Sequence, residues 1–92
     1  MALVHSVISV NDTTPTLLTD FSNSTKASIT INIQNLGAVA IYLGGKNLTT
    51  SSYGVLLSPG GNANLEDLEP GETVYALSTS GTTYVAVWMI KR

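Results

Sequence analysis

Apolar and polar residues alternate along most of this chain. The clearest case is segment 27–34, where Ile29, Ile31 and Ile33 share one side and polar residues occupy the other. A period of two places successive side chains on opposite faces of a β-strand, and β-branched residues favour that conformation. This pattern predicts a half-buried strand whose isoleucines point into the core.

The same period occurs near both ends of the chain. Residues 3–10 predict a strand with two faces, one carrying Val4, Ser6, Ile8 and Val10 and the other Leu3, His5, Val7 and Ser9. Residues 83–90 predict another, with Val85, Val87 and Met89 opposite Tyr84, Ala86, Trp88 and Ile90. Both faces of this last strand are apolar. It is therefore central in its sheet, or one of its faces meets a partner subunit.

Shorter strands are expected over 39–43, 55–57, 62–66 and 73–79, and segment 16–19 is either a short strand or a docking segment. Turn residues separate them at 11–15, 35–37, 58–61 and 69–72, and residues 80–82 are expected to close a hairpin. Seven or eight short strands with regular turns indicate an all-β fold, an antiparallel β-sandwich or a jelly-roll-like barrel. We expect residues 27–92 to form the sandwich domain. Residues 1–26 are either its first strand or a separate N-terminal arm.

Composition excludes several classes of function. The 92 residues contain no cysteine, and only 11% of them are charged, against roughly a quarter in an ordinary soluble domain. A net charge of −2 argues against a nucleic-acid partner. No apolar run reaches the roughly 20 residues of a membrane span. The first residues lack the basic start of a secretory signal, so we expect synthesis in a cytoplasm.

Candidate catalytic chemistry is sparse. His5 is the single histidine and lies on an alternating strand, and no G-x-S-x-G motif is present. The carboxylates of Glu66, Asp67, Glu69 and Glu72 indicate either a solvated acidic turn or a weak calcium site. We expect no enzyme activity, no catalytic residue, no metal ligand and no cofactor.

The aromatic residues allow three interpretations. The residues concerned are Tyr42, Tyr53, Tyr75, Tyr84 and Trp88. They pack in the core and across strands, form a protein interface, or provide a platform for carbohydrate. Depletion of charged residues is typical of the centre of protein interfaces. The composition therefore favours a protein that works while docked against others.

From Ile29 onward the chain resembles small virion proteins of tailed bacteriophages. The resemblance rests on these segments, in order: 35–37 (NLG), 41–45 (IYLGG), 48–49 (LT), 53–57 (YGVLL), 58–61 (SPGG), 72–78 (ETVYALS), 81–82 (GT) and 85–87 (VAV). It implies a β-sandwich or jelly-roll-like module on a virion, often trimeric, without catalytic residues.

The resulting expectation is a capsid decoration protein on the capsid exterior, a homotrimer whose partner is the major capsid protein. The expected capsid-docking residues are Leu3, Val4, Leu17, Leu18 and Phe21, and the expected subunit-interface residues are Tyr84, Trp88 and Ile90. The principal alternative is a receptor- or carbohydrate-binding module of a phage tail or fibre. A small hydrolase using the acidic cluster is the remaining alternative.

Overall fold

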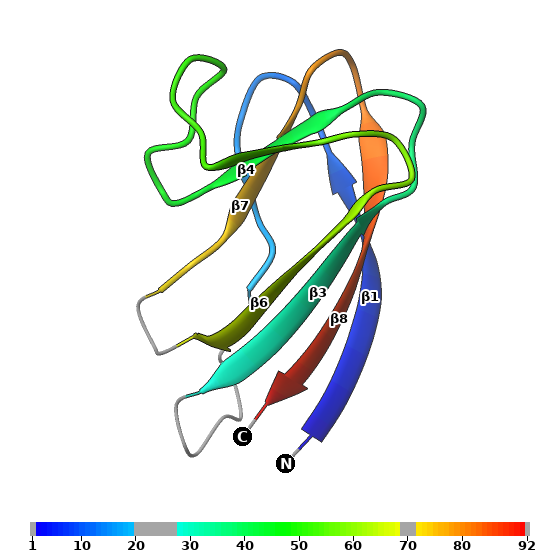
Figure 1. Cartoon of the computed structure of the whole chain (residues 1–92). Coiled ribbons are helices and arrows are strands. Elements are labelled where there is room, and N and C mark those ends of the chain that lie inside the picture. The colour runs from blue at the N-terminus through cyan, green and yellow to red at the C-terminus, as the bar shows by residue number, and fades with distance from the viewer. Residues whose placement is uncertain (1, 20–27, 69–71, 92) are drawn as a thin grey trace.

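The protein is an antiparallel β-sandwich of two four-stranded sheets (Figure 1). The computed structural model describes residues 2–19, 28–68 and 72–91. The first sheet contains, in order, β1 (Ala2–Val10), β8 (Thr83–Lys91), β3 (Ile29–Asn35) and β6 (Asn62–Leu68). The second contains β2 (Thr16–Leu17), β7 (Tyr75–Ser78), β4 (Ile41–Gly44) and β5 (Val55–Leu57). The all-β fold class predicted from the sequence is confirmed, with sandwich rather than barrel architecture.

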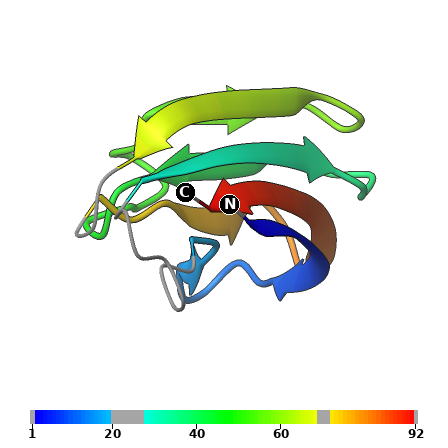
Figure 2. The same cartoon turned by 90° about the horizontal axis from the view of Figure 1, so that it is seen from below.

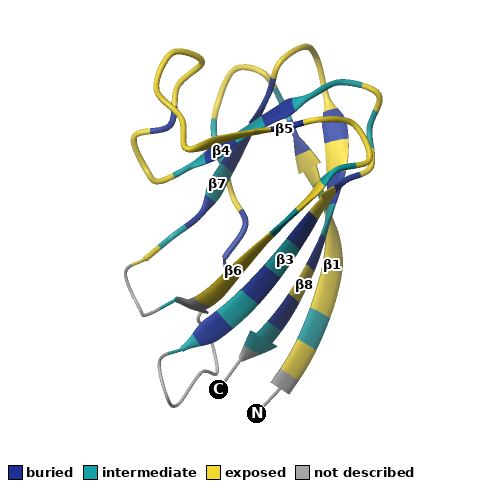
Figure 3. Cartoon of the chain, viewed as in Figure 1, coloured by how far each residue is buried: buried dark blue, intermediate teal, exposed yellow. Residues whose placement is uncertain are grey.

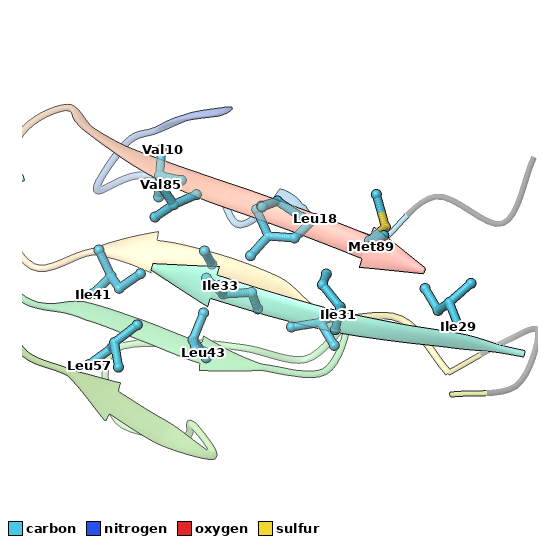
Figure 4. Close-up of a cluster of buried hydrophobic side chains, with 13 residues drawn as sticks. Val10, Leu18, Ile29, Ile31, Ile33, Ile41, Leu43, Leu57, Val85 and Met89 are labelled. Atoms are coloured by element: carbon cyan, nitrogen blue, oxygen red, sulfur yellow. The ribbon is translucent and has the colours of Figure 1, made fainter. Parts of the chain in front are cut away.

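The alternating residues of both sheets form one core. Along β3 the inward isoleucines are fully buried while Thr30 and Asn32 between them are half-buried, which produces the banding in Figure 3. The core side chains converge between the sheets (Figure 4) and are Val10, Leu18, Ile29, Ile31, Ile33, Ile41, Leu43, Leu57, Val74, Ala76, Val85, Val87 and Met89. Burial of this apolar surface is the main favourable term in folding.

The N-terminal segment is an integral part of the sandwich. Strand β1 pairs with β8 over its whole length, from Ala2 opposite Lys91 to Val10 opposite Thr83. Of the two interpretations of residues 3–10, the structure shows the first strand of the sheet and not a separate arm. Strand β8 lies between β1 and β3 and is therefore central in its sheet, as one of the two interpretations expected, while its outer apolar side chains remain accessible (Figure 2).

The prediction that residues 80–82 close a hairpin is wrong. Strand β7 pairs with β2 and β4 in the second sheet, whereas β8 pairs with β1 and β3 in the first. The turn carries the chain from one sheet to the other, with Gly81 at a φ of 64°. Among consecutive strands only β4 and β5 are neighbours in one sheet. A turn signal shows that the chain reverses, but it does not show to which sheet the next strand belongs.

Asn35 ties the two sheets together at the end of β3. Its side-chain Nδ2 donates to the carbonyls of Val39 (2.8 Å) and Leu57 (3.1 Å), and its Oδ1 accepts from the Gly37 amide (3.0 Å). Its backbone bonds the turn before β6, since Asn35 N donates to Gly61 O and Gly60 N donates to Asn35 O. The residue is 1% exposed, so these bonds satisfy polar groups that water does not reach.

The turn after β1 has the side-chain bonding that its sequence predicts. The Asn11 side-chain oxygen accepts from the amides of Thr13 (3.0 Å) and Thr14 (2.8 Å). The next residue, Asp12, accepts from the Gly81 amide at 2.9 Å and so joins this turn to the one before β8. Residues 69–71 of the predicted acidic turn lie outside the described part of the chain.

Candidate binding surfaces

The expected capsid-docking residues do not form one surface. Leu3 points outward from the first sheet and is 61% exposed, whereas Val4 faces the opposite way and is half-buried. Leu17 is 46% exposed on the outer side of the second sheet. Leu18 is 2% exposed and belongs to the core, so its docking role is wrong: it cannot contact a partner while the sandwich is folded. Phe21 lies outside the described residues.

The outer side of the first sheet carries a group of large apolar side chains. We call it the Trp88 face and define it by Leu3, Val7, Tyr84, Trp88 and Ile90. Register places these residues on adjacent strands, because Leu3 pairs with Ile90 and His5 with Trp88. Trp88 is 56% exposed, although an aromatic side chain gains a great deal from burial. The expected interface residues Tyr84, Trp88 and Ile90 thus share one accessible face, and the trimer itself stays a prediction.

Four side-chain amides extend over β3 and β6 on the same face, and one of them, Asn32, lies beside Trp88. Asn32 of β3 is the cross-strand partner of Trp88 on one side and of Asn64 on the other. Gln34, two residues along β3, pairs with Asn62 in the same way. We call these four residues the amide square. Among the described residues none of these four side chains makes a hydrogen bond; Gln34, Asn62 and Asn64 are exposed and Asn32 is half-buried.

Two shallow hollows flank the Trp88 side chain. One has a volume of about 390 Å³ and lies over β1, β8 and β3, with His5, Val7 and Gln34 in its lining. The other, about 320 Å³, lies over β8, β3 and β6, with Thr30, Asn64 and Ile90 in its lining. Trp88 and Asn32 line both. The indole therefore stands between two open depressions that contain both apolar and amide groups.

The second sheet presents a different apolar surface on the opposite side of the molecule. We call it the tyrosine face and define it by Leu17, Tyr42, Tyr53, Leu56 and Tyr75. The inward neighbours of these residues, Ile41, Leu57 and Ala76, are core residues, which fixes the outward direction. Tyr42 pairs with Leu56 across the strands, and its ring lies 4.6 Å from that of Tyr53.

The aromatic residues are therefore divided between two faces. Tyr42 and Tyr75 belong to strands of the second sheet, Tyr53 lies in the β4–β5 loop with its ring against that of Tyr42, and Tyr84 and Trp88 belong to the first sheet. None of the five belongs to the core cluster. Sequence reasoning missed the amide square, although outward Asn and Gln residues at alternating positions of two strands were visible in the sequence.

The other candidate chemical groups stay dispersed. His5 lies on the Trp88 face, opposite Trp88. Within residues 2–19, 28–68 and 72–91, no three His, Cys, Asp or Glu side chains gather as metal ligands would. Glu66 is exposed at the end of β6, and Glu69 lies outside the described part. Gly44 ends β4, and Gly45 and Lys46 begin the β4–β5 loop, where the Leu48 amide donates to the Gly45 carbonyl at 3.1 Å.

No known family model and no curated protein matches this chain. The described residues contain no helix long and apolar enough to cross a membrane. Arguments about function therefore rest on the two faces and their chemistry.

Proposed function

We propose that this protein is a non-enzymatic virion structural protein that attaches to the outer surface of a phage capsid and stabilises the shell. The tyrosine face is the proposed docking surface for the major capsid protein. The observation that supports it is a cluster of tyrosine and leucine side chains, with Tyr53 and Leu56 exposed and Tyr42 half-buried, on a sheet whose strands β2, β4, β5 and β7 carry no charged residue. The sequence resemblance to small phage virion proteins points the same way.

The chemistry of this face suits a protein partner. Tyrosine supplies a large apolar contact area together with a hydroxyl that can bond at the rim, and it is enriched among residues that dominate binding energy. The absence of charged residues from these strands means that docking of the strands themselves desolvates no isolated ion. Each contact can be modest, because a capsid repeats it by symmetry.

A trimer on the shell is part of the proposal. The threefold or quasi-threefold positions of the capsid arrange three copies side by side, so a preformed trimer in solution is not required. This arrangement leaves the Trp88 face directed away from the capsid, because the two faces lie on opposite sheets.

Co-sedimentation of the purified protein with expanded capsid shells that lack it tests the proposal. We expect the wild-type protein to bind and Leu56→Glu, on the tyrosine face, to bind more weakly. Val7→Glu places the same charge on the opposite face, where Val7 is comparably exposed, and is expected to retain binding. Failure of the wild-type protein to bind, or equal weakening by both substitutions, would overturn the proposal.

The second candidate function is a receptor- or carbohydrate-binding module of a tail or fibre. It is favoured by one observation, the exposed Trp88 with the amide square beside it. The two functions use opposite faces, so the substitutions above separate them.

A further inference from the structure

We propose that the Trp88 face binds a neutral carbohydrate, with Trp88 as the stacking platform and the amide square as the hydroxyl-binding group. This inference rests on the second candidate function and specifies its ligand class, and it is independent of capsid attachment because it concerns the opposite face of the sandwich. It also holds for the isolated protein, so its test does not depend on a shell.

Trp88 provides the apolar half of the site. Its side chain is 56% exposed and stands between the hollows of about 390 Å³ and about 320 Å³. One side of a pyranose ring is lined by C–H groups, and these pack against the face of an indole. Concave sites that combine aromatic groups with a few polar groups are the usual form of small-molecule sites.

The amide square provides the polar half. Adjacent strands place paired side chains about 5 Å apart, and residues two apart on a strand are about 7 Å apart. Asn32, Gln34, Asn62 and Asn64 thus cover an area comparable with one sugar residue. Each amide side chain has two N–H donors and a carbonyl acceptor, so it can accept from one hydroxyl of a sugar and donate to the neighbouring hydroxyl.

The charge distribution selects a neutral ligand. No Asp, Glu, Lys or Arg occupies the described outward positions of three strands of this sheet, which are 3, 5, 7 and 9 in β1, 30, 32 and 34 in β3, and 84, 86, 88 and 90 in β8. Among the described residues of the first sheet, the acidic residue nearest to the amide square along a strand is Glu66 of β6, two residues after Asn64. A carboxylate there repels acidic sugars, and no arginine or lysine at those outward positions offers them a partner.

A carbohydrate also fits this face better than a protein does. A protein surface that covers the amide square must satisfy four amides together, because a buried amide without a partner is costly. A sugar carries hydroxyls around its ring and meets this requirement in any of several orientations. The tyrosine face has no comparable group of amides on its strands.

The single tryptophan makes the test direct, since Trp88 is the only fluorophore of its kind in the chain. The probes are soluble oligosaccharides of glucose in α- and β-linkage, of mannose and of galactose, with oligogalacturonate as an acidic comparison. We expect at least one neutral probe at millimolar concentration to shift the emission of Trp88 and to protect it from quenching by acrylamide. Oligogalacturonate is expected to leave both unchanged.

Variants locate the site. Asn32→Leu and Gln34→Leu are each expected to weaken binding about tenfold, the loss that corresponds to one or two neutral hydrogen bonds. Asn47→Leu is the matched control, because Asn47 is an exposed amide in the β4–β5 loop, away from this face. Trp88→Ala is expected to abolish binding in calorimetry, with an unchanged circular dichroism spectrum showing that the sandwich is intact.

Three results would overturn the proposal. The first is that no neutral probe changes the Trp88 signal, and the second is that Asn47→Leu weakens binding as much as Asn32→Leu. The third is a stable oligomer in solution that Trp88→Ala dissociates. That last result would assign Tyr84, Trp88 and Ile90 to a subunit interface, as the sequence alone suggested.

Discussion

Replacement of Asn35 tests whether a single side chain joins the two sheets. Asn35→Ala removes two donated bonds, to Val39 O and Leu57 O, and one accepted from Gly37 N. A buried polar group left without its partner costs about 1–3 kcal/mol, and the bonds here are buried or partly buried. Taking the lower part of that range for each of the three, we expect a loss of about 3–4 kcal/mol.

That loss is large against the total stability of a domain, which is about 5–15 kcal/mol. For a domain of this size, 1 kcal/mol corresponds to a change of roughly 4–8 °C in the midpoint of thermal unfolding. We therefore expect Asn35→Ala to unfold at least about 12 °C below the wild-type protein. Calorimetry and urea unfolding followed by circular dichroism measure both quantities.

The control is Asn64→Ala, which removes the same amide from an exposed position without a partner among the described residues. Its free energy of unfolding should stay within about 0.5 kcal/mol of the wild-type value. A loss below about 1 kcal/mol for Asn35→Ala, or an equal loss in both variants, would refute the role assigned to the Asn35 network.

Asn35→Asp adds a dependence on pH. The substitution keeps the shape of the side chain but replaces the Nδ2 donor by an oxygen facing two carbonyls. Only the protonated acid can donate there, so burial and the two carbonyls raise the pKa of the introduced carboxyl above its ordinary value of about 3.9. A raised pKa in the folded state means that stability is fullest below about pH 3.9 and is lost as the pH rises through the folded value. We expect the deficit relative to wild type to grow from about pH 4 to about pH 7, and a constant deficit would contradict this reasoning.

Three further predictions concern the core and its edges. The Thr83 hydroxyl is buried without a hydrogen-bond partner in the described residues. Thr83→Val should therefore raise the free energy of unfolding by about 1 kcal/mol, measured by urea unfolding. The same substitution at the exposed Thr82 should leave it unchanged. In the same assay Leu18→Ala should lower the free energy of unfolding by about 2–5 kcal/mol, and Leu17→Ala by about 0.5 kcal/mol or less. Similar losses in the two variants would contradict the placement of Leu18 in the core. A Cβ on Gly37 would overlap the Thr83 side chain, so Gly37→Ala should lower the free energy of unfolding by about 1–3 kcal/mol. The loss caused by Gly37→Ala should be smaller in a protein that already carries Thr83→Ala. Additive losses in this double-mutant cycle would contradict the contact.

Much of the fold follows from local pattern. The alternation at Ile29, Ile31 and Ile33 identified inward residues that the structure buries, and the alternation in the last strand grouped Val85, Val87 and Met89 on one face, which the structure also buries. The physical reason is that successive side chains of a strand point to opposite faces, whatever the strand pairs with. The same rule divided the residues of β1 and β8 correctly between two faces without deciding which face is outward, and turn residues such as Asn11 marked where the chain reverses.

Sheet membership and the composition of each face were decided only by the tertiary structure. No local signal states that β7 and β8 enter different sheets, and the expected hairpin between them failed for that reason. Leu17 and Leu18 look alike in sequence, yet one is exposed and the other buried, because the pairing of β2 with β7 fixes which side faces the core.

The Trp88 face depends on the tertiary structure most of all. Trp88, Asn32 and Asn64 are distant in the chain and become neighbours only through the register of β8, β3 and β6. The alternation predicted that Asn32 points outward, but it placed Trp88 only on one of the two apolar faces of its strand. Their assembly into one surface required non-local strand pairing, which a period of two residues does not encode.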